Sequence, residues 1–192
     1  EINNESLDIN EENKVVFLDT YLPFHPDYTM QKQRPPSEPE IYFSKLRAFF
    51  DSIEKQLSIK VIVALHPRSS YSKAELNAYF GNRTCQQNNT AQLIKDAKFI
   101  ISGPSTSISF AILFKKPIQL ITTDEIKTHN LEFGATLSYS KELNSPIINI
   151  SNPENYKQYS IPKIHTSNYD VYIENYLSCS KEKDKLSTEI LI

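Results

Sequence analysis

The sequence predicts an α/β fold in which helices cover both faces of a Rossmann-like parallel sheet. Two observations support this prediction. Short apolar segments alternate along the chain with segments whose apolar residues recur at helical spacing. In addition, residues 59–65 (IKVIVAL) are apolar almost throughout, which is typical of a strand buried on both faces. Strands of that kind are found in parallel sheets.

The individual elements follow from periodicity and from turn residues. Serine precedes an acidic residue by three positions at Ser37 and Glu40 and again at Ser167 and Asp170, which is the spacing of a capping box. Residues 20–37 contain four prolines and predict a long irregular loop. The predicted strands are 15–18, 59–65, 99–101, 118–121 and 147–150. The predicted helices are 37–57, 73–80, 89–95, 105–114 and 167–177, and the helix at 105–114 is apolar on most sides, so we expect it to be buried.

The length and composition limit the domain organisation and the class of function. A chain of 192 residues suits one domain or two small ones. We expect a polar lead-in over 1–14, a Rossmann-like domain over 15–180 and a flexible tail over 181–192. The net charge of -2 offers no basic surplus for nucleic acid. Cys85 and Cys179 lack the spacing of a zinc site or a disulfide framework.

The loop at residues 102–107 is the first candidate binding site. It lies between a predicted strand and a predicted helix, where ligands bind in parallel α/β sheets. Gly103 would allow close approach of the backbone, and the three hydroxyl side chains that follow Pro104 could join the helix N–H groups in holding a phosphate. Ordinary helix capping by serine and threonine explains the same residues. The candidate phosphate-binding residues here are Gly103, Ser105, Thr106 and Ser107.

A second candidate site follows the strand at 59–65. His66 can donate a hydrogen bond to a phosphate oxygen, Pro67 stiffens the turn, and Arg68 can pair with a phosphate through its guanidinium group. A loop histidine beside an exposed arginine is the simpler interpretation. Because the carboxyl ends of parallel strands meet at one edge of a sheet, the two loops can face one ligand if their strands lie close together.

Together these loops carry a resemblance to a known family. The segments "VALHPRSSYS" and "FIISGPSTSISFAILFKKPIQLIT" resemble the donor-nucleotide domain of bacterial glycosyltransferases with two Rossmann domains, the GT-B architecture. The likeness is greatest to lipooligosaccharide sialyltransferases and capsule polysialyltransferases, whose His-Pro and Ser-Ser or Ser-Thr motifs contact the phosphate of a CMP-activated sugar. By this resemblance His66 and Pro67 match the first motif and residues 105–107 match the second. "VVFLDTYLP" is similar to the strand that opens the donor domain, and the resemblance covers most of residues 15–122.

The resemblance implies one half of a GT-B glycosyltransferase. Such a domain would take a nucleotide-activated sugar, with a CMP-linked donor such as sialic acid favoured, for transfer to a glycan acceptor in lipopolysaccharide or capsule biosynthesis. His66 would be catalytic, and neither a metal nor another cofactor is expected. The expected location is the cytoplasm, including the inner face of the inner membrane. In the family a preceding acceptor-side domain supplies an acidic general base, and there is no room for one before Val15, so we expect the base on another segment or an incomplete enzyme.

Two alternatives to a transferase stay open. One is a non-catalytic nucleotide-binding or assembly module derived from such an enzyme. The other is a sugar-nucleotide epimerase on the same two-domain plan, which would need acid and base carboxylates in the cleft.

Other polar residues can be assigned in two ways. Asp124 and Glu125 follow the strand at 118–121, where a carboxylate can accept a ribose hydroxyl or cap a helix. Asn89 and Thr90 can line a base pocket or cap a helix. We expect Asp19 to be a plain strand-end aspartate. The scattered histidines, His25, His129 and His165, are expected to be surface or packing residues.

Overall fold

The computed structural model describes residues 13–177, and it confirms the Rossmann-like α/β fold. Within this range six parallel strands form one sheet in the order β3-β2-β1-β4-β5-β6. The strands are β1 Lys14–Leu18, β2 Lys60–Ala64, β3 Cys85–Gln86, β4 Phe99–Ser102, β5 Ile118–Thr122 and β6 Ile147–Asn149. The order reverses between β1 and β4, and ligands of such sheets bind at the carboxyl ends of the strands beside this point. The lead-in, apart from its last two residues, and the tail at 181–192 lie outside the described residues, as does Cys179.

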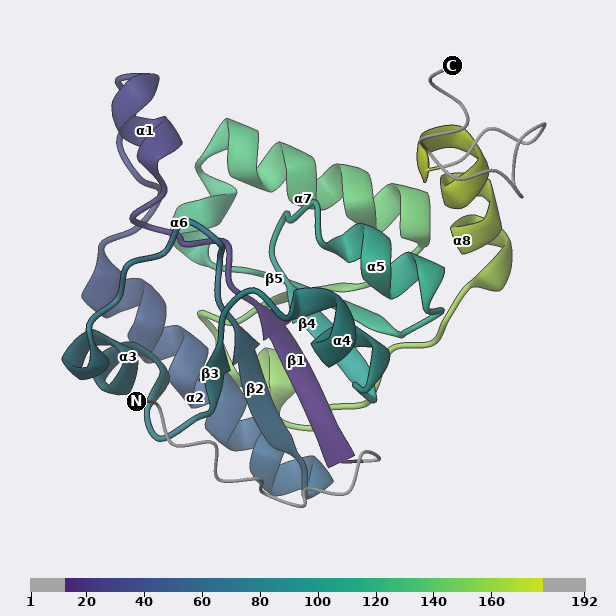
Figure 1. Ribbon diagram of the computed structural model, residues 1–192, viewed down its shortest axis with the longest axis horizontal. Helices are drawn as coiled ribbons and strands as arrows, with labels where there is room; N and C mark the ends of the chain where they lie inside the picture. Colours follow the sequence, from purple (N-terminus) through teal and green to yellow (C-terminus); the bar gives the residue numbers. More distant parts are fainter. Residues whose placement is uncertain (1–12, 178–192) are drawn as a thin grey trace.

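Helices cover both faces of the sheet (Figure 1). The described helices are α1 Pro26–Met30, α2 Pro39–Leu57, α3 Lys73–Phe80, α4 Thr90–Lys95, α5 Ile108–Leu113, α6 Asp124–Lys127, α7 Asn130–Leu143 and α8 Thr166–Tyr172, with a 3₁₀ turn at Pro153–Tyr156 and a π turn at Ile173–Leu177. One face carries α2 and α3, and the other carries α4, α5, α7 and α8. In Figure 1, α1 projects beyond the carboxyl end of β1.

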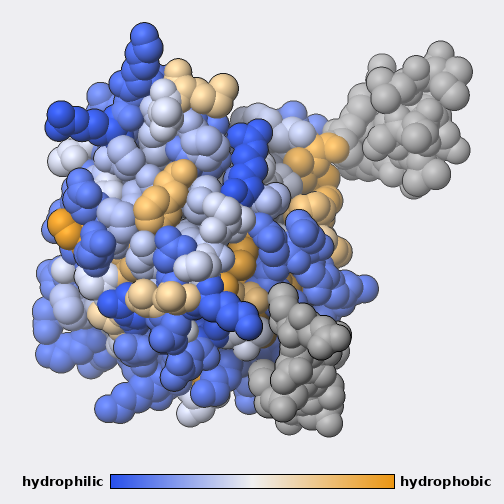
Figure 2. Space-filling model, turned by 60° about the vertical axis from the view of Figure 1, so that its left-hand side comes forward, coloured by the Kyte–Doolittle hydropathy of each residue, from blue (hydrophilic) through white to orange (hydrophobic). Residues whose placement is uncertain are grey.

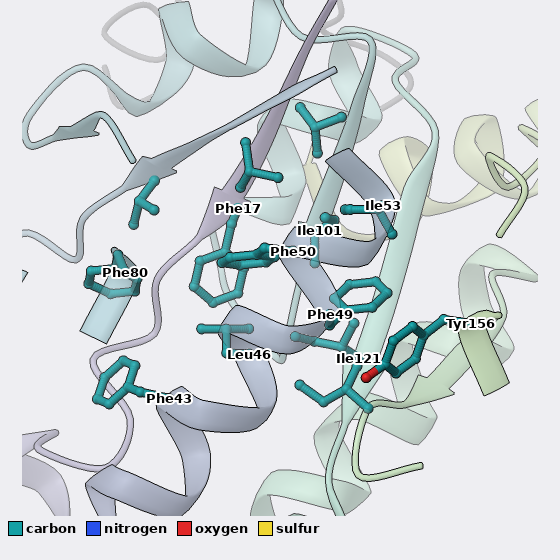
Figure 3. Close-up of a cluster of buried hydrophobic side chains, with 14 of the residues drawn as sticks. Phe17, Phe43, Leu46, Phe49, Phe50, Ile53, Phe80, Ile101, Ile121 and Tyr156 are labelled. Atoms are coloured by element: carbon teal, nitrogen blue, oxygen red, sulfur yellow. The ribbon is translucent and has the colours of Figure 1, made fainter. Parts of the chain in front are cut away.

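The central strand β1 is buried on both faces because its side chains alternate between two cores. Val16 lies opposite Ile62 of β2 and Ile100 of β4, and all three face the core beneath α4 and α5. Phe17 points to the other core, where its ring meets Phe50 of α2 edge-on at 5.1 Å between centroids. Figure 3 shows how the aromatic side chains of α2 fill this second core.

The predicted strands are confirmed to within about two residues, and β3 adds a strand of only two residues. The helix predicted from residue 37 is also confirmed, but its capping box is wrong. Pro39 begins α2, so Glu38 takes the cap position, and the Ser37 hydroxyl donates to the Glu38 carbonyl oxygen at 3.2 Å. Ser167 lies inside α8, whose cap is His165, and so cannot form the second predicted box. The box that forms is Ser72 with Glu75 at the start of α3.

The expected burial of the 105–114 helix is wrong for its outer face. The regular helix, α5, begins at Ile108 after a turn closed by a hydrogen bond from the Ile108 N–H to the Ser105 carbonyl. Its inner residues pack on the sheet. The outer side chains remain partly exposed, at 41% for Phe110, 49% for Leu113 and 38% for Phe114.

None of the helices within residues 13–177 combines the length and the apolar composition needed to cross a bilayer. The face shown in Figure 2 is covered mainly by hydrophilic side chains, with smaller hydrophobic areas between them.

Candidate functional site

A cavity of about 390 Å³ opens at the carboxyl ends of β1, β2 and β4. Its floor includes Asp19 and Thr20, which follow β1. Further lining residues come from α1 and from the first turn of α7. The cavity therefore lies where the strand order reverses, which is the usual ligand position in doubly wound sheets.

The two candidate phosphate loops face this one cavity. His66 and Pro67 line it from the turn after β2, and residues 105–107 line it from the turn after β4. These strands flank β1 on opposite sides. Thr90, at the start of α4, reaches the same cavity. The sequence places these groups on separate loops, and the fold brings them together.

Two residues of the same loops lie elsewhere. The Arg68 side chain is 65% exposed, and its Nη1 lies 3.6 Å from Asp27 Oδ1, so the guanidinium group pairs with a carboxylate of the rim. Gly103 lines a smaller neighbouring cavity. A side chain added at Gly103 would meet no atom within 4 Å, so the open space there leaves room for a ligand to approach the backbone.

The candidate ribose and base contacts are mostly engaged within the protein. Asp124 Oδ1 accepts a hydrogen bond from Asn149 Nδ2 at 2.6 Å, and Glu125 Oε1 pairs with Lys45 Nζ at 2.5 Å. Burial opposes ionisation of Glu125, but the hydrogen bond and charge of Lys45 outweigh it and lower the pKa of that carboxyl. Asn89 takes the N-cap position of α4 without a capping hydrogen bond from its side chain, and its Nδ2 donates to Gln86 Oε1 at 3.4 Å. Of this set, only Thr90 lines the larger cavity.

The protonation of His66 follows from its hydrogen bonds. The backbone N–H of Arg68 donates to His66 Nδ1 at 3.1 Å, so the neutral ring carries its proton on Nε2 and can donate from that atom. Burial lowers the pKa of His66, and the charges of His25 and Arg68 lower it further. The Tyr21 ring lies nearly parallel to the imidazole, at 9° and 6.1 Å between centroids. At neutral pH His66 is therefore an oriented, uncharged hydrogen-bond donor.

Asp19 follows β1 and is buried, with its carboxyl group hydrogen-bonded to two backbone N–H groups. The side chain is only 4% exposed. Its Oδ1 accepts the N–H of Tyr21 at 2.9 Å, and its Oδ2 accepts the N–H of His66 at 3.4 Å. Burial raises the pKa of Asp19 to about 6, although these two hydrogen bonds favour the charged form. Asp19 thus joins the loop after β1 to the His66 turn.

Two histidines expected to be surface or packing residues also line the cavity. His25 lies beside His66, with 5.1 Å between ring centroids, and His129 lies beside Tyr28 at 5.9 Å. The Tyr28 hydroxyl donates to Glu132 Oε1 at 2.5 Å. No local motif marks these residues, because only the packing of α1 against α7 brings them together. His165 lies away from the cavity, near Asn144.

The hydroxyl loop is partly organised by itself. The Ser107 N–H donates to Ser105 Oγ at 3.3 Å, which holds the turn before α5 in a compact shape. Thr106 is exposed and the two serines are half-buried. Within residues 13–177 no three His, Cys, Asp or Glu side chains are gathered so that they could hold a metal ion.

No family model and no curated protein matches the chain. Among solved structures, the chain is similar to the co-structure of S. aureus MnaA with UDP, at 16% identity and a TM-score of 0.39, over 87% of this chain and 47% of that one. The chain therefore spans about half the length of that protein. The assignment of the fold rests on the strand order.

Proposed function

We propose that the cavity binds a nucleotide-activated sugar and that the chain is the donor-binding domain of a glycosyltransferase. The observation that carries the proposal is that His66 and residues 105–107 line one cavity at the point where the strand order reverses. A phosphate between the two turns would meet an imidazole donor on one side and hydroxyl donors on the other. These are the groups that bind phosphate in proteins without a metal.

The proposed mechanism is electrostatic. When the glycosidic bond to the phosphate breaks, negative charge develops on the leaving phosphate oxygen. His66 Nε2–H and the hydroxyl groups of residues 105–107 would donate to that charge, and because the fold holds them in place, little reorganisation is needed. We propose that protein donors perform this task without a metal. The cytidine nucleotide, the glycan acceptor and a site of action at the cytoplasmic face of the inner membrane are proposals that rest on the sequence resemblance.

The test is calorimetry with CMP, CDP, UDP and GDP on the wild type and on His66→Ala. The variant should bind the preferred nucleotide more weakly, and transfer from the matching sugar nucleotide should fall by about 100-fold, the scale for losing one donor to a developing anion. His165→Ala is the matched control, because that histidine does not line the cavity. Equal nucleotide affinity in the wild type and in His66→Ala would reject the proposal. Binding without hydrolysis or transfer would favour the non-catalytic module.

A further inference from the structure

We infer that the cavity continues from His66 into a subsite for a neutral, polyhydroxylated sugar, and that an acidic sugar such as sialic acid is disfavoured there. This inference rests on the proposed function and adds the chemical class of the sugar. The subsite is formed by α1, the loop after it and the first turn of α7. We call it the α1–α7 wall, and its residues are His25, Tyr28, Gln31, Gln33, His129 and Glu132.

The wall is continuous with the proposed phosphate site. The ring of His25 lies 5.1 Å from that of His66, and the Tyr28 ring lies 6.5 Å beyond His25. His129 follows at 5.9 Å from Tyr28. A sugar attached to a phosphate at His66 would therefore lie directly against these side chains.

The wall offers both donors and acceptors of hydrogen bonds. The Nδ1 atoms of His25 and His129 accept backbone N–H groups, at 3.3 Å from Asp27 and 3.4 Å from Glu132, so each ring keeps Nε2–H as a donor for a ligand. The amides of Gln31 and Gln33 supply both kinds of group. A sugar hydroxyl donates and accepts at once, and a mixed set of this kind suits it, whereas an anion needs donors alone.

Charge decides between a neutral and an acidic sugar. Among the described residues that line the cavity there is no lysine or arginine, whereas Asp19, Asp27 and Glu132 each bring a carboxyl group. Arg68 lies beside the lining, and its Nη1, 3.6 Å from Asp27 Oδ1, is already paired with that carboxylate. The carboxylate of an acidic sugar would face these like charges, and the nearest guanidinium group, that of Arg68, is already paired with Asp27, so binding the carboxylate is costly. A neutral sugar avoids that cost.

The wall is also held in place before any ligand arrives. Tyr28 is only 7% exposed, and its hydroxyl donates to Glu132 at 2.5 Å, which fastens α1 to α7. Burial and the hydrogen bond to Glu132 raise the pKa of Tyr28, so it stays a hydroxyl at physiological pH. Glu132 is therefore oriented, and a hydroxyl group that meets it needs little rearrangement of the protein.

The test compares each nucleotide with its sugar conjugate by calorimetry on the wild-type chain. The pairs are CMP with CMP-sialic acid, CDP with CDP-glucose, UDP with UDP-glucose and GDP with GDP-mannose. We expect at least one neutral conjugate to bind about 10-fold or more tightly than its nucleotide, since each hydrogen bond contributes about 3- to 10-fold. CMP-sialic acid should bind no more tightly than CMP.

Variants then locate the gain. Glu132→Gln keeps an acceptor for Tyr28, and Gln33→Ala changes an exposed side chain, so it is the second variant if the first unfolds. Both should lower the affinity for the neutral conjugate about 3- to 10-fold and leave that for the nucleotide unchanged. Glu154→Gln, on an exposed turn, is the matched control.

The outcomes separate the two proposals. If a nucleotide binds but no neutral sugar adds affinity, or if sialic acid adds the most, this inference is overturned and the proposed function stands. Loss of nucleotide affinity in the wall variants also contradicts the subsite. If no nucleotide binds at all, both proposals fail.

Discussion

Replacing Asp19 with asparagine should change how stability depends on pH. The side chain is 4% exposed, and burial raises its pKa from an ordinary 3.8 to about 6. The folded state therefore holds the proton more tightly than the unfolded state. Between these two pKa values the folded state binds more protons, so stability must fall as pH rises through this window.

The size of the effect follows from the two pKa values. Their difference corresponds to about 3 kcal/mol, which the wild type has below pH 4 and loses by about pH 7. The amide of an asparagine at this position would carry no charge at any pH. The variant should thus gain stability relative to the wild type by about 3 kcal/mol between pH 4 and pH 7.

Urea unfolding at several pH values measures this difference, followed by tyrosine fluorescence because the chain has 11 tyrosines and no tryptophan. Each protein then gives a curve of unfolding free energy against pH. Subtracting the wild-type curve from that of Asp19→Asn removes the contributions of the histidines and the other carboxyl groups. Asp170→Asn controls for loss of a carboxyl group at the surface. If the two curves of unfolding free energy against pH, for the wild type and for Asp19→Asn, run parallel from pH 4 to pH 7, Asp19 is not desolvated as described.

Three further perturbations test the packing of the fold. Phe50→Ala removes a fully buried ring and should cost about 3–5 kcal/mol in urea unfolding, and a loss below about 1 kcal/mol would contradict the described core. Arg83→Met should lower the free energy of unfolding by about 2 kcal/mol, because the Arg83 side chain is 9% exposed and its Nη2 lies 2.7 Å from the half-buried carboxylate of Glu54. As the control, Lys157→Met in an exposed ion pair should leave it almost unchanged. Burial raises the pKa of the Cys85 thiol to about 12. In a Cys179→Ser background, a disulfide reagent at pH 8 should therefore label Cys85 far more slowly in the native chain than in the urea-unfolded chain. Equal labelling rates would show an accessible thiolate.

The sheet and the two candidate phosphate loops could be predicted because their signals are local. The apolar run at 59–65 contains β2, and the polar residues that follow it must lie at the carboxyl edge of a parallel sheet. The same reasoning holds for residues 102–107 after β4. Their meeting in one cavity depends only on both strands flanking β1, which is the usual order in this fold class.

The rest of the site depends on contacts that no local pattern encodes. Only Thr136 and Leu143 of α7 are buried, so the helix has little apolar periodicity and was not predicted. The bond from Tyr28 to Glu132 joins residues 104 positions apart. The position of Asp19 at a strand end was evident in the sequence, but its burial beneath the His66 turn was not.

The central position of β1 also affects how a bound molecule would act on the chain. A molecule held by both His66 and Ser105 would connect segments that the sequence separates by α3, β3, α4 and β4. Such a bridge acts as a reversible crosslink, since pulling the two halves of the sheet apart would first require the molecule to leave. A bound molecule should therefore protect the whole domain from proteases, and not merely the loops that contact it.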